Sequence, residues 1–386
     1  MKKIGILTYM KEYANLGTNM QSYCTFKAIQ KQFPNDQVEL INYSSWKPAM
    51  KPYFSQITIR SLINDYIRIR KYKSFFENEY IFSKKKLITS NLKDSINFIE
   101  NQNYDAIFVG SDTVLELKRA KKNELTAYWL DDTVKCKKFL ISACSLDVTF
   151  EVLSDQQKKQ IQSTINDYSL LGVRDDATFR LLSHFTRQGD ERLKIIPDPT
   201  FTFEIDYRHI EEYISQKKLV FKKPMICLHL LRDTKWASAL ADYFRKDGYI
   251  VASLRPAYYA DIIFTDLSAF EQMGLYRYFD LVITHRFHDS IFCIKNLTPV
   301  IVYPQYISDV THYGENKNKT LLKSFNIVDN YINNKEDITA LSLFNMHKRA
   351  IKYFKNNEEF IKKTLLDNKN NYESFVIESS KLLNSN

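Results

Sequence analysis

The sequence predicts an α/β protein with parallel sheets in two domains, followed by a C-terminal helical tail. Apolar runs and amphipathic segments alternate along most of the 386 residues, as expected when helices cover parallel strands. A chain of this length exceeds the size at which a single core stops growing. A polar stretch around residues 205–222 interrupts the alternation. We therefore expect domains at residues 1–205 and 206–343, with the tail at 344–386.

Strands and helices are expected in alternation within residues 1–205. Buried apolar runs predict strands at 4–9, 37–42, 104–110, 138–143, 170–173 and 194–196. Amphipathic segments predict helices at 20–32, over much of 55–102, from 154 to 168 and from 175 to 184. Ser154 followed by Gln157 has the spacing of a capping box, and Asp175 or Asp176 can cap the next helix.

Residues 206–343 repeat this alternation. Strands are expected at 224–230, 249–254, 281–284 and 299–303, and a helix at 236–247 ends before Gly248. Ser268 and Glu271 form a second capping-box pattern. The charged tail is expected to be helical and to pack back across the first domain.

The chain is basic, with 55 Lys and Arg against 45 Asp and Glu and a net charge of +10. This balance favours polyanions, anionic membrane surfaces or anionic small substrates as partners. The densest basic stretch, residues 66–86, interleaves aromatic side chains with Lys and Arg. It carries no recognition motif, so we expect no nucleic-acid partner. A solvated amphipathic helix is one interpretation, and peripheral contact with an anionic membrane is another.

The five cysteines are scattered and include no C-x-x-C pair, which is typical of reduced thiols in a cytosolic protein. The first apolar run is too short for a signal peptide, and no window of about 18 apolar residues occurs. The sequence contains no ligand-spaced metal cluster and no dinucleotide, phosphate-loop or serine-elbow motif. We therefore expect a cytoplasmic protein, peripheral at most to the inner face of the membrane, with no metal or cofactor.

The most informative motif follows the strand expected at 281–284. A short loop carries His285, Arg286 and His288, and a helix opens near Asp289 and Ser290. Ligands bind at the carboxyl ends of strands in open α/β sheets, and a helix N-terminus favours an anion. Arg binds phosphate or carboxylate through two parallel hydrogen bonds, and His can act as a general acid. The loop predicts a site for an anion that also needs a proton; a merely solvated loop is the alternative.

A second arginine occupies a similar position. Arg174 follows the strand expected at 170–173 and precedes a helix. It is a candidate for a second anion-binding residue, and a salt bridge to Asp175 or Asp176 is the alternative.

Two loops of the first domain are candidates for contacts to a sugar. Gly110 lets a ligand approach the backbone, and Ser111 and Asp112 can bond hydroxyl groups, with Asp112 also a candidate base. An ordinary turn with a capping Asp is the alternative for that loop. The other loop, Gly17-Thr18-Asn19, follows the first strand and is similar to a phosphate-binding or sugar-binding loop.

Six short motifs occur in the order and at the strand ends typical of one family. They are Gly17-Thr-Asn-Met-Gln-Ser-Tyr23, Asp105-Ala-Ile-Phe-Val-Gly-Ser-Asp112, Ile141-Ser-Ala-Cys-Ser145, Leu171-Gly-Val-Arg-Asp-Asp176, Asp198-Pro-Thr-Phe201 and Leu281-Val-Ile-Thr-His-Arg-Phe-His-Asp-Ser-Ile-Phe292. On these motifs the chain resembles the polysaccharide pyruvyl transferase family, from residue 4 to about residue 325.

The resemblance implies two Rossmann-like domains facing a cleft, the glycosyltransferase-B arrangement, with the acceptor on the first domain and the donor on the second. It implies phosphoenolpyruvate as donor and a sugar or lipid-linked glycan of the cell surface as acceptor. The product is a pyruvate ketal that bridges two hydroxyls. The resemblance assigns Arg286 and His288 to donor binding and proton transfer, and Arg174 to anion binding.

Two other functions remain open on the sequence alone. A sugar-nucleotide glycosyltransferase of the same fold would need a carboxylate for a ribose, for which Asp261 and Asp266 are candidates. A basic scaffold that binds anionic glycans or nucleic acid without turnover is the other alternative, although such a scaffold needs no proton donor.

Overall fold

A computed structural model of the chain describes residues 1–10, 15–45, 59–117, 120–146, 148–230, 235–304, 317–333 and 338–385. The chain divides into two compact units. Unit 1 comprises Met1–Ala49, Phe76–Phe203 and Asp367–Asn386, and unit 2 comprises Met50–Phe75 and Glu204–Leu366. Each unit contains its own parallel sheet with helices on its faces, so the predicted α/β class is confirmed.

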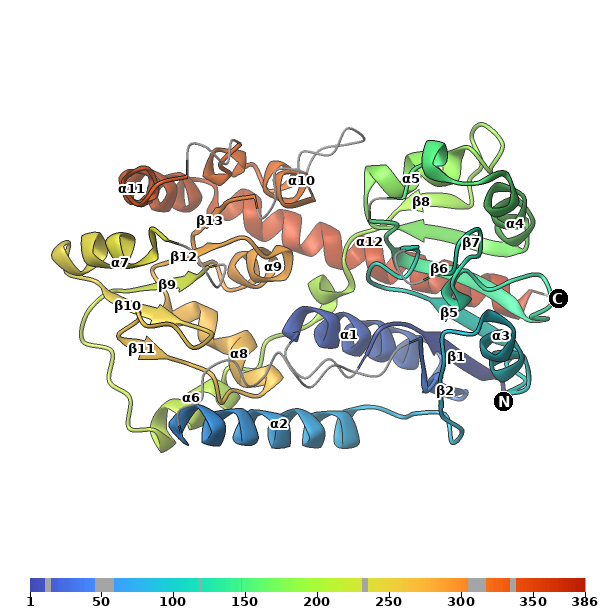
Figure 1. Cartoon of the computed structure of the whole chain (residues 1–386), viewed down its shortest axis with the longest axis horizontal. Helices are drawn as coiled ribbons and strands as arrows, with labels where there is room; N and C mark the ends of the chain where they lie inside the picture. Colours follow the sequence, from blue (N-terminus) through green and yellow to red (C-terminus); the bar gives the residue numbers. More distant parts are fainter. Residues whose placement is uncertain are drawn as a thin grey trace. The chain divides into compact units, whose positions relative to one another are not determined.

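The sheet of unit 1 has the strand order β2-β1-β5-β6-β7-β8, and all neighbouring strands run parallel (Figure 1). Its strands are β1 (Lys3–Leu7), β2 (Gln37–Leu40), β5 (Ala106–Val109), β6 (Lys137–Ala143), β7 (Tyr168–Val173) and β8 (Leu193–Ile195). A separate two-stranded ribbon pairs β3 (Tyr43–Ser44) with β4 (Leu87–Ile88). The predicted strands of this domain are thus present, each with slightly shifted ends.

The helices of unit 1 cover both faces of its sheet. They are α1 (Leu16–Gln32), α3 (Leu92–Glu100), α4 (Asp155–Asn166), α5 (Asp176–Ser183) and the last part of α12 (Glu358–Asn384), with short 3₁₀ turns η2 (Ala127–Trp129), η3 (Phe150–Val152) and η4 (Pro199–Thr202).

The central strand β5 shows why this sheet carries helices on both sides. Ile107 and Val109 belong to the core cluster that α3 and α4 complete, whereas Phe108 packs against Phe33 just after α1 at a ring distance of 6.2 Å. All residues of β5 are therefore buried, as is typical of a strand with two covered faces. Burial of a side chain such as Phe108 stabilises the fold by about 1.5–3 kcal/mol.

Helix starts agree with the predicted caps. Ser154 with Gln157 and Ser268 with Glu271 both form complete capping boxes, and the Asp175 side chain caps α5. These local signals are confirmed because they depend on residues only three positions apart.

The sheet of unit 2 has the strand order β11-β10-β9-β12-β13, again with parallel neighbours. Its strands are β9 (Met225–His229), β10 (Ile250–Ser253), β11 (Ile262–Ile263), β12 (Leu281–Thr284) and β13 (Val300–Val302). The short strand β11 was not expected from the sequence.

The helices of unit 2 pack around this sheet, with α7 and α11 along one face (Figure 1). They are α6 (Arg208–Gln216), α7 (Ala237–Lys246), α8 (Ala269–Leu275), α9 (Phe287–Lys295), α10 (Lys317–Ser324), α11 (Ala340–Asn356) and the start of α12, with 3₁₀ turns η5 (Tyr276–Tyr278) and η7 (Val328–Asn330). Helix α2 (Ile59–Glu79) also belongs to unit 2 as far as Phe75.

Two segments belong to a different unit from the one expected. The break near residue 205 falls between Phe203 and Glu204, but α2 up to Phe75 belongs to unit 2. It is held there by the Lys71–Glu271 ion pair at 2.7 Å and by Phe75 against Phe270.

The C-terminal tail is also divided between the units. Helix α11 packs in unit 2, where Phe344 contacts Phe244 at 5.4 Å, so the expectation that all of 344–386 packs on the first domain was wrong. Only the last part of α12 packs there, with Tyr372 donating to Thr25 and Lys194 paired with Glu378.

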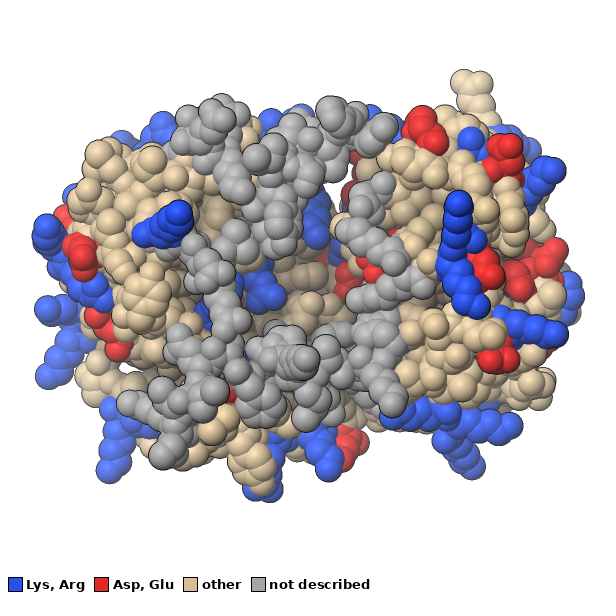
Figure 2. All heavy atoms as spheres, in the orientation of Figure 1, with Lys and Arg blue, Asp and Glu red and all other residues tan. Residues whose placement is uncertain are grey.

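Charged side chains of both signs share the visible face of the described chain. In Figure 2 the Lys and Arg side chains are interspersed with Asp and Glu, so no uninterrupted basic patch is visible on it. Among the described helices, none is long and apolar enough to cross a membrane. All five cysteines are free, and all but Cys136 are buried.

Candidate functional site

The carboxyl ends of β10, β9 and β12 lie along one edge of the unit 2 sheet. The register pairs Cys227 with Ala252 on one side and with Val282 on the other, so the three strands end level with one another. His229 closes β9 beside Thr284, which closes β12. Because ligands of open parallel sheets bind beyond this edge, it is the candidate site.

A buried pair of His229 and Asp289 lies at this edge. The Nδ1 of His229 is 2.6 Å from Oδ2 of Asp289, and the residues are 3% and 4% exposed. Thr284 donates to the same oxygen at 2.8 Å, and the Tyr276 hydroxyl donates to Oδ1 at 2.9 Å. Protein donors therefore occupy both carboxylate oxygens. Asp289 thus orients His229, and its predicted contact with a substrate stays a prediction.

Burial and charge fix the protonation states at this edge. Burial alone would raise the pKa of Asp289, but His229, Arg286 and the Thr284 hydroxyl together lower it well below its usual range. Burial lowers the pKa of His229 more than the adjacent Asp289 raises it, and Arg286 adds to the lowering. Burial, with His229 and Arg286, lowers the pKa of His285 to about 3. At neutral pH, His229 is thus neutral and donates Nδ1–H to an ionised Asp289, which leaves its Nε2 as an acceptor.

Arg286 is placed at the start of α9. Its backbone N–H donates to Thr284 Oγ1 at 3.1 Å, and its carbonyl accepts from Ser290 Oγ at 3.1 Å. Ser290 itself is fully buried, and its predicted contact with a substrate stays a prediction. Within the described ranges, the half-buried guanidinium of Arg286 forms no hydrogen bond or ion pair. An unengaged guanidinium beside a helix N-terminus is suited to an anion.

The two histidines of this loop differ in exposure. His285 is buried, with Nδ1 at 3.5 Å from the Tyr303 hydroxyl, and its carbonyl accepts from Asn318. His288 lies half-buried in the first turn of α9, with its ring centroid 6.1 Å from that of Phe292. Because His285 and His229 are held neutral, they are poor proton donors, and the predicted donor role stays with His288.

In unit 1, Arg174 forms a buried ion pair. Its Nη1 lies 2.9 Å from Oδ2 of Asp198, and the side chains are 5% and 1% exposed. Gln21 donates to the same oxygen at 2.6 Å. The sequence left a salt bridge to Asp175 or Asp176 open; the observed partner is Asp198, because Asp175 caps α5. The anion-binding role of Arg174 stays a prediction.

The two predicted sugar loops of unit 1 meet at Asp112. Its Oδ2 accepts from Thr18 Oγ1 at 2.9 Å, and its Oδ1 accepts from the Thr113 N–H at 2.8 Å. Gly17, Thr18 and Asn19 lie in the first turn of α1, which begins at Leu16, four residues before the predicted helix start at residue 20. Asn19 and Ser111 are fully buried. Their predicted contacts with a sugar stay predictions, and Thr18 and Asp112 are the more accessible pair.

Gly110 has a structural reason of its own. Its φ is +121°, and a Cβ placed there would lie 2.1 Å from the carbonyl oxygen of Ile141. Glycine is thus required by the close approach of the chain to β6, and the predicted approach of a ligand at Gly110 stays a prediction.

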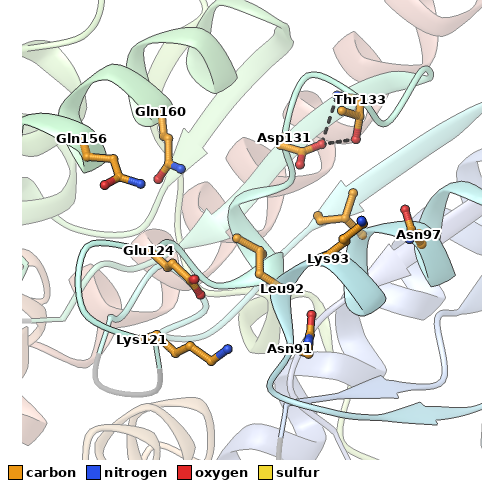
Figure 3. Close-up of a pocket in the computed structure, with 11 residues that line it drawn as sticks. Asn91, Leu92, Lys93, Asn97, Lys121, Glu124, Asp131, Thr133, Gln156 and Gln160 are labelled. Carbon is orange, nitrogen blue, oxygen red and sulfur yellow. Dashed lines mark hydrogen bonds between the residues drawn. The ribbon is translucent and has the colours of Figure 1, made fainter.

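A polar hollow of about 560 Å³ lies elsewhere on unit 1 (Figure 3). Side chains of α3, α4 and the chain between β5 and β6 line it, and Asp131 accepts from the backbone and hydroxyl of Thr133. None of the predicted site residues lines this hollow. Among the described residues, no group of three or more His, Cys, Asp or Glu could hold a metal ion.

The family model for polysaccharide pyruvyl transferases matches residues 15–305, which include both the Arg174 and the Arg286 motifs. The chain belongs to this family. The resemblance stated from the six motifs is therefore confirmed. No curated protein matches the chain.

Solved structures with the same fold support the predicted architecture of this family member. The UDP-GlcNAc 2-epimerase of Neisseria meningitidis bound to UDP-GlcNAc has a TM-score of 0.59 at 10% identity, covering 100% of both chains. The S. aureus MnaA–UDP co-structure has a TM-score of 0.54 at 11% identity, covering 93% of this chain and 91% of that one. The trehalose-6-phosphate phosphatase N-terminal domain of Candida albicans has a TM-score of 0.52 at 13% identity, covering 99% and 96%. The expected glycosyltransferase-B-like fold is confirmed.

Two residues of the pyruvyl transferase family member were missed from the sequence. His229 is the last residue of β9. His285 was selected because it follows a predicted strand, and the same criterion would have selected His229. Asp198 follows β8 and belongs to the quoted Asp198-Pro-Thr-Phe201 motif, but nothing local links it to Arg174.

Proposed function

We propose that this chain transfers the pyruvyl unit of phosphoenolpyruvate onto two hydroxyls of a sugar, forming a pyruvate ketal. The acceptor belongs to a cell-surface polysaccharide or its lipid-linked precursor. The observation that carries the proposal is the Arg286 guanidinium, which has no ion-pair partner in the described chain and stands at the N-terminus of α9 beside His288. Membership of the polysaccharide pyruvyl transferase family supports it.

The proposed chemistry starts with a proton. His288 gives a proton to the methylene carbon of phosphoenolpyruvate, which becomes a methyl group and leaves an oxocarbenium-like centre at C2. One sugar hydroxyl attacks C2 and loses its proton. The C–O bond to phosphate then breaks, phosphate leaves with the electron pair, and the second hydroxyl closes the ketal. Two hydroxyl protons are released; one replaces the proton of His288 and one goes to phosphate.

The charged groups have separate roles in this proposal. Arg286 and the first turn of α9 bind the phosphate and stabilise it as it leaves. The ionised Asp289 holds His229 in one tautomer behind the loop, which keeps Arg286 and His288 in place. Asp112 is the candidate base for the acceptor, although both its oxygens accept hydrogen bonds within unit 1.

The sugar-nucleotide glycosyltransferase is the second candidate function, because two solved structures of the same fold, S. aureus MnaA and the Neisseria meningitidis epimerase, are bound to UDP and to UDP-GlcNAc. The two carboxylates considered for a ribose are already engaged. Asp261 accepts from the Val251 N–H at 2.9 Å and from Arg245, and Asp266 accepts from Tyr213 at 2.7 Å. This observation favours pyruvyl transfer.

Contact with a lipid-linked acceptor at the membrane is part of the proposal. Helix α2 exposes Ile63 and Tyr66, 54% and 61% exposed, on a segment that also carries Arg70 and Lys73. Such a pairing of apolar and basic side chains suits an anionic bilayer surface. Co-flotation with anionic but not neutral vesicles is the expected result, and equal flotation with both would contradict it.

The deciding experiment supplies phosphoenolpyruvate with a panel of lipid-linked and nucleotide-linked sugars. We expect phosphate release together with a pyruvyl mass gain on one acceptor, and loss of both signals in Arg286→Ala and His288→Ala. Arg208→Ala is the matched control, because Arg208 is 81% exposed and pairs locally with Asp206. Turnover of a sugar nucleotide without either signal would move the chain to the glycosyltransferase function.

A further inference from the structure

Arg255 lies at the same edge of the unit 2 sheet as Arg286. It follows β10 by two residues, and its N–H donates to Ser253 Oγ at 3.4 Å. Both β10 and β12 are neighbours of β9, one on each side. The two arginines therefore follow strands that flank His229.

Neither guanidinium at this edge has a counter-ion in the described chain. The Nε of Arg255 is buried and has no hydrogen-bond partner among those residues, and Arg286 forms no ion pair there. Other arginines of unit 2, Arg208, Arg245 and Arg277, each pair with a carboxylate. Withdrawing two cations from water without giving them partners destabilises the folded chain. Their placement therefore points to an anionic ligand.

The nearby acid cannot neutralise both arginines. Asp289 accepts hydrogen bonds from His229, Thr284 and Tyr276. Its carboxylate carries one negative charge, whereas the two guanidiniums carry two positive charges. Burial lowers the pKa of Arg255, and the charge of Arg286 lowers it further, so each cation destabilises the other until an anion binds.

We propose that Arg255 binds the carboxylate of the donor while Arg286 and the start of α9 bind its phosphate. This assignment rests on phosphoenolpyruvate being the donor, as proposed above. Its phosphate and carboxylate are both attached at C2 and diverge from it, so they need two partners. Phosphate suits the helix N-terminus beside Arg286. Arg255 follows β10, on the other side of β9, and we assign it to the carboxylate. A guanidinium binds a planar carboxylate through two parallel hydrogen bonds.

The test compares two probes, phosphoenolpyruvate and inorganic phosphate, by calorimetry on the full chain at fixed salt. We expect Arg255→Ala to weaken phosphoenolpyruvate binding about 10- to 100-fold and to leave phosphate binding unchanged. Arg286→Ala should weaken both, and the exposed control Arg208→Ala should weaken neither. Arg255→Lys keeps a charge but not the paired geometry, so its phosphoenolpyruvate affinity should lie between those of the wild type and Arg255→Ala.

Retained phosphate binding also reports that the two Arg255 variants are folded. Unchanged phosphoenolpyruvate binding in Arg255→Ala would overturn the assignment. A loss of phosphate binding in Arg255→Ala as large as its loss of phosphoenolpyruvate binding would overturn it too, because Arg255 would then serve the phosphate. If the wild-type chain binds phosphate but not phosphoenolpyruvate, the proposed function is wrong, because phosphoenolpyruvate is then not the donor.

Discussion

His229 and Asp289 meet through a hydrogen bond of 2.6 Å although they are 60 residues apart in sequence. The bond joins the end of β9 to the first turn of α9, so it ties the anion-binding loop to the neighbouring strand. Since the Thr284 and Tyr276 hydroxyls point to the same carboxylate, Asp289 is the centre of the network that orients the loop.

Replacing Asp289 by Asn should therefore damage both stability and activity. The amide of Asn keeps the size of Asp289 but loses one acceptor oxygen, which leaves a buried donor of His229, Thr284 or Tyr276 unsatisfied. We expect the free energy of unfolding to fall by about 1–3 kcal/mol, measured by urea denaturation. Asp131→Asn is the control, because the Asp131 side chain accepts from the exposed Thr133 turn. Equal stability of the two variants would contradict the central role of Asp289.

His288 should act on the chemical step rather than on binding. His288→Ala is expected to lower kcat about 10²- to 10⁴-fold while leaving the KM for phosphoenolpyruvate nearly unchanged, since the lost group donates a proton in the transition state. The control is His184→Ala, an exposed histidine of unit 1 stacked on Phe150. Steady-state kinetics on the acceptor found in the panel will check this; a change confined to KM would remove the acid role.

The stability of the chain should depend on pH through His285. Its pKa lies at about 3 in the folded chain against an ordinary value of 6.5, so the unfolded chain binds one more proton between these values. The resulting stability is complete above pH 6.5 and falls by at most about 1.4 kcal/mol per pH unit as the pH decreases toward 3.

Urea unfolding at several pH values measures this slope. His285→Asn should make the slope shallower by about one proton. Identical slopes in the wild type and His285→Asn would show that His285 titrates alike in the folded and unfolded chain.

The sequence predicted most strands to within a few residues of their ends, because each strand depends on a local pattern. The loop from His285 to Ser290 was found in this way, as were the caps at Ser154 and Ser268. The partners were not predictable, because the sheet order decides them: Asp289 reaches His229 only since β9 and β12 are neighbours. The same reason hid the partner of Arg174.

Contacts between elements far apart in the sequence explain why α2 belongs to unit 2 and not to the domain expected for residues 1–205. The basic pattern of α2 predicted a helix but not the unit on which it packs. Glu271 helps to hold α2 on unit 2, because it pairs with Lys71, which lies 200 residues away in the sequence. Only the folded chain shows this contact.

The requirement for glycine at residue 110 is testable against a second glycine with positive φ. Gly110→Ala meets the carbonyl oxygen of Ile141 at 2.1 Å in addition to its φ of +121°, whereas Gly189→Ala has a φ of +71° and nothing within 4 Å. We expect Gly189→Ala to cost about 1–2 kcal/mol from backbone strain alone, and Gly110→Ala to cost more than about 3 kcal/mol. Urea denaturation of both variants separates the two contributions, because the clash with β6 is present in only one of them. Similar losses in the two variants would mean that the chain at Gly110 can move away from β6, and a role in ligand approach would then be the better reason for this glycine.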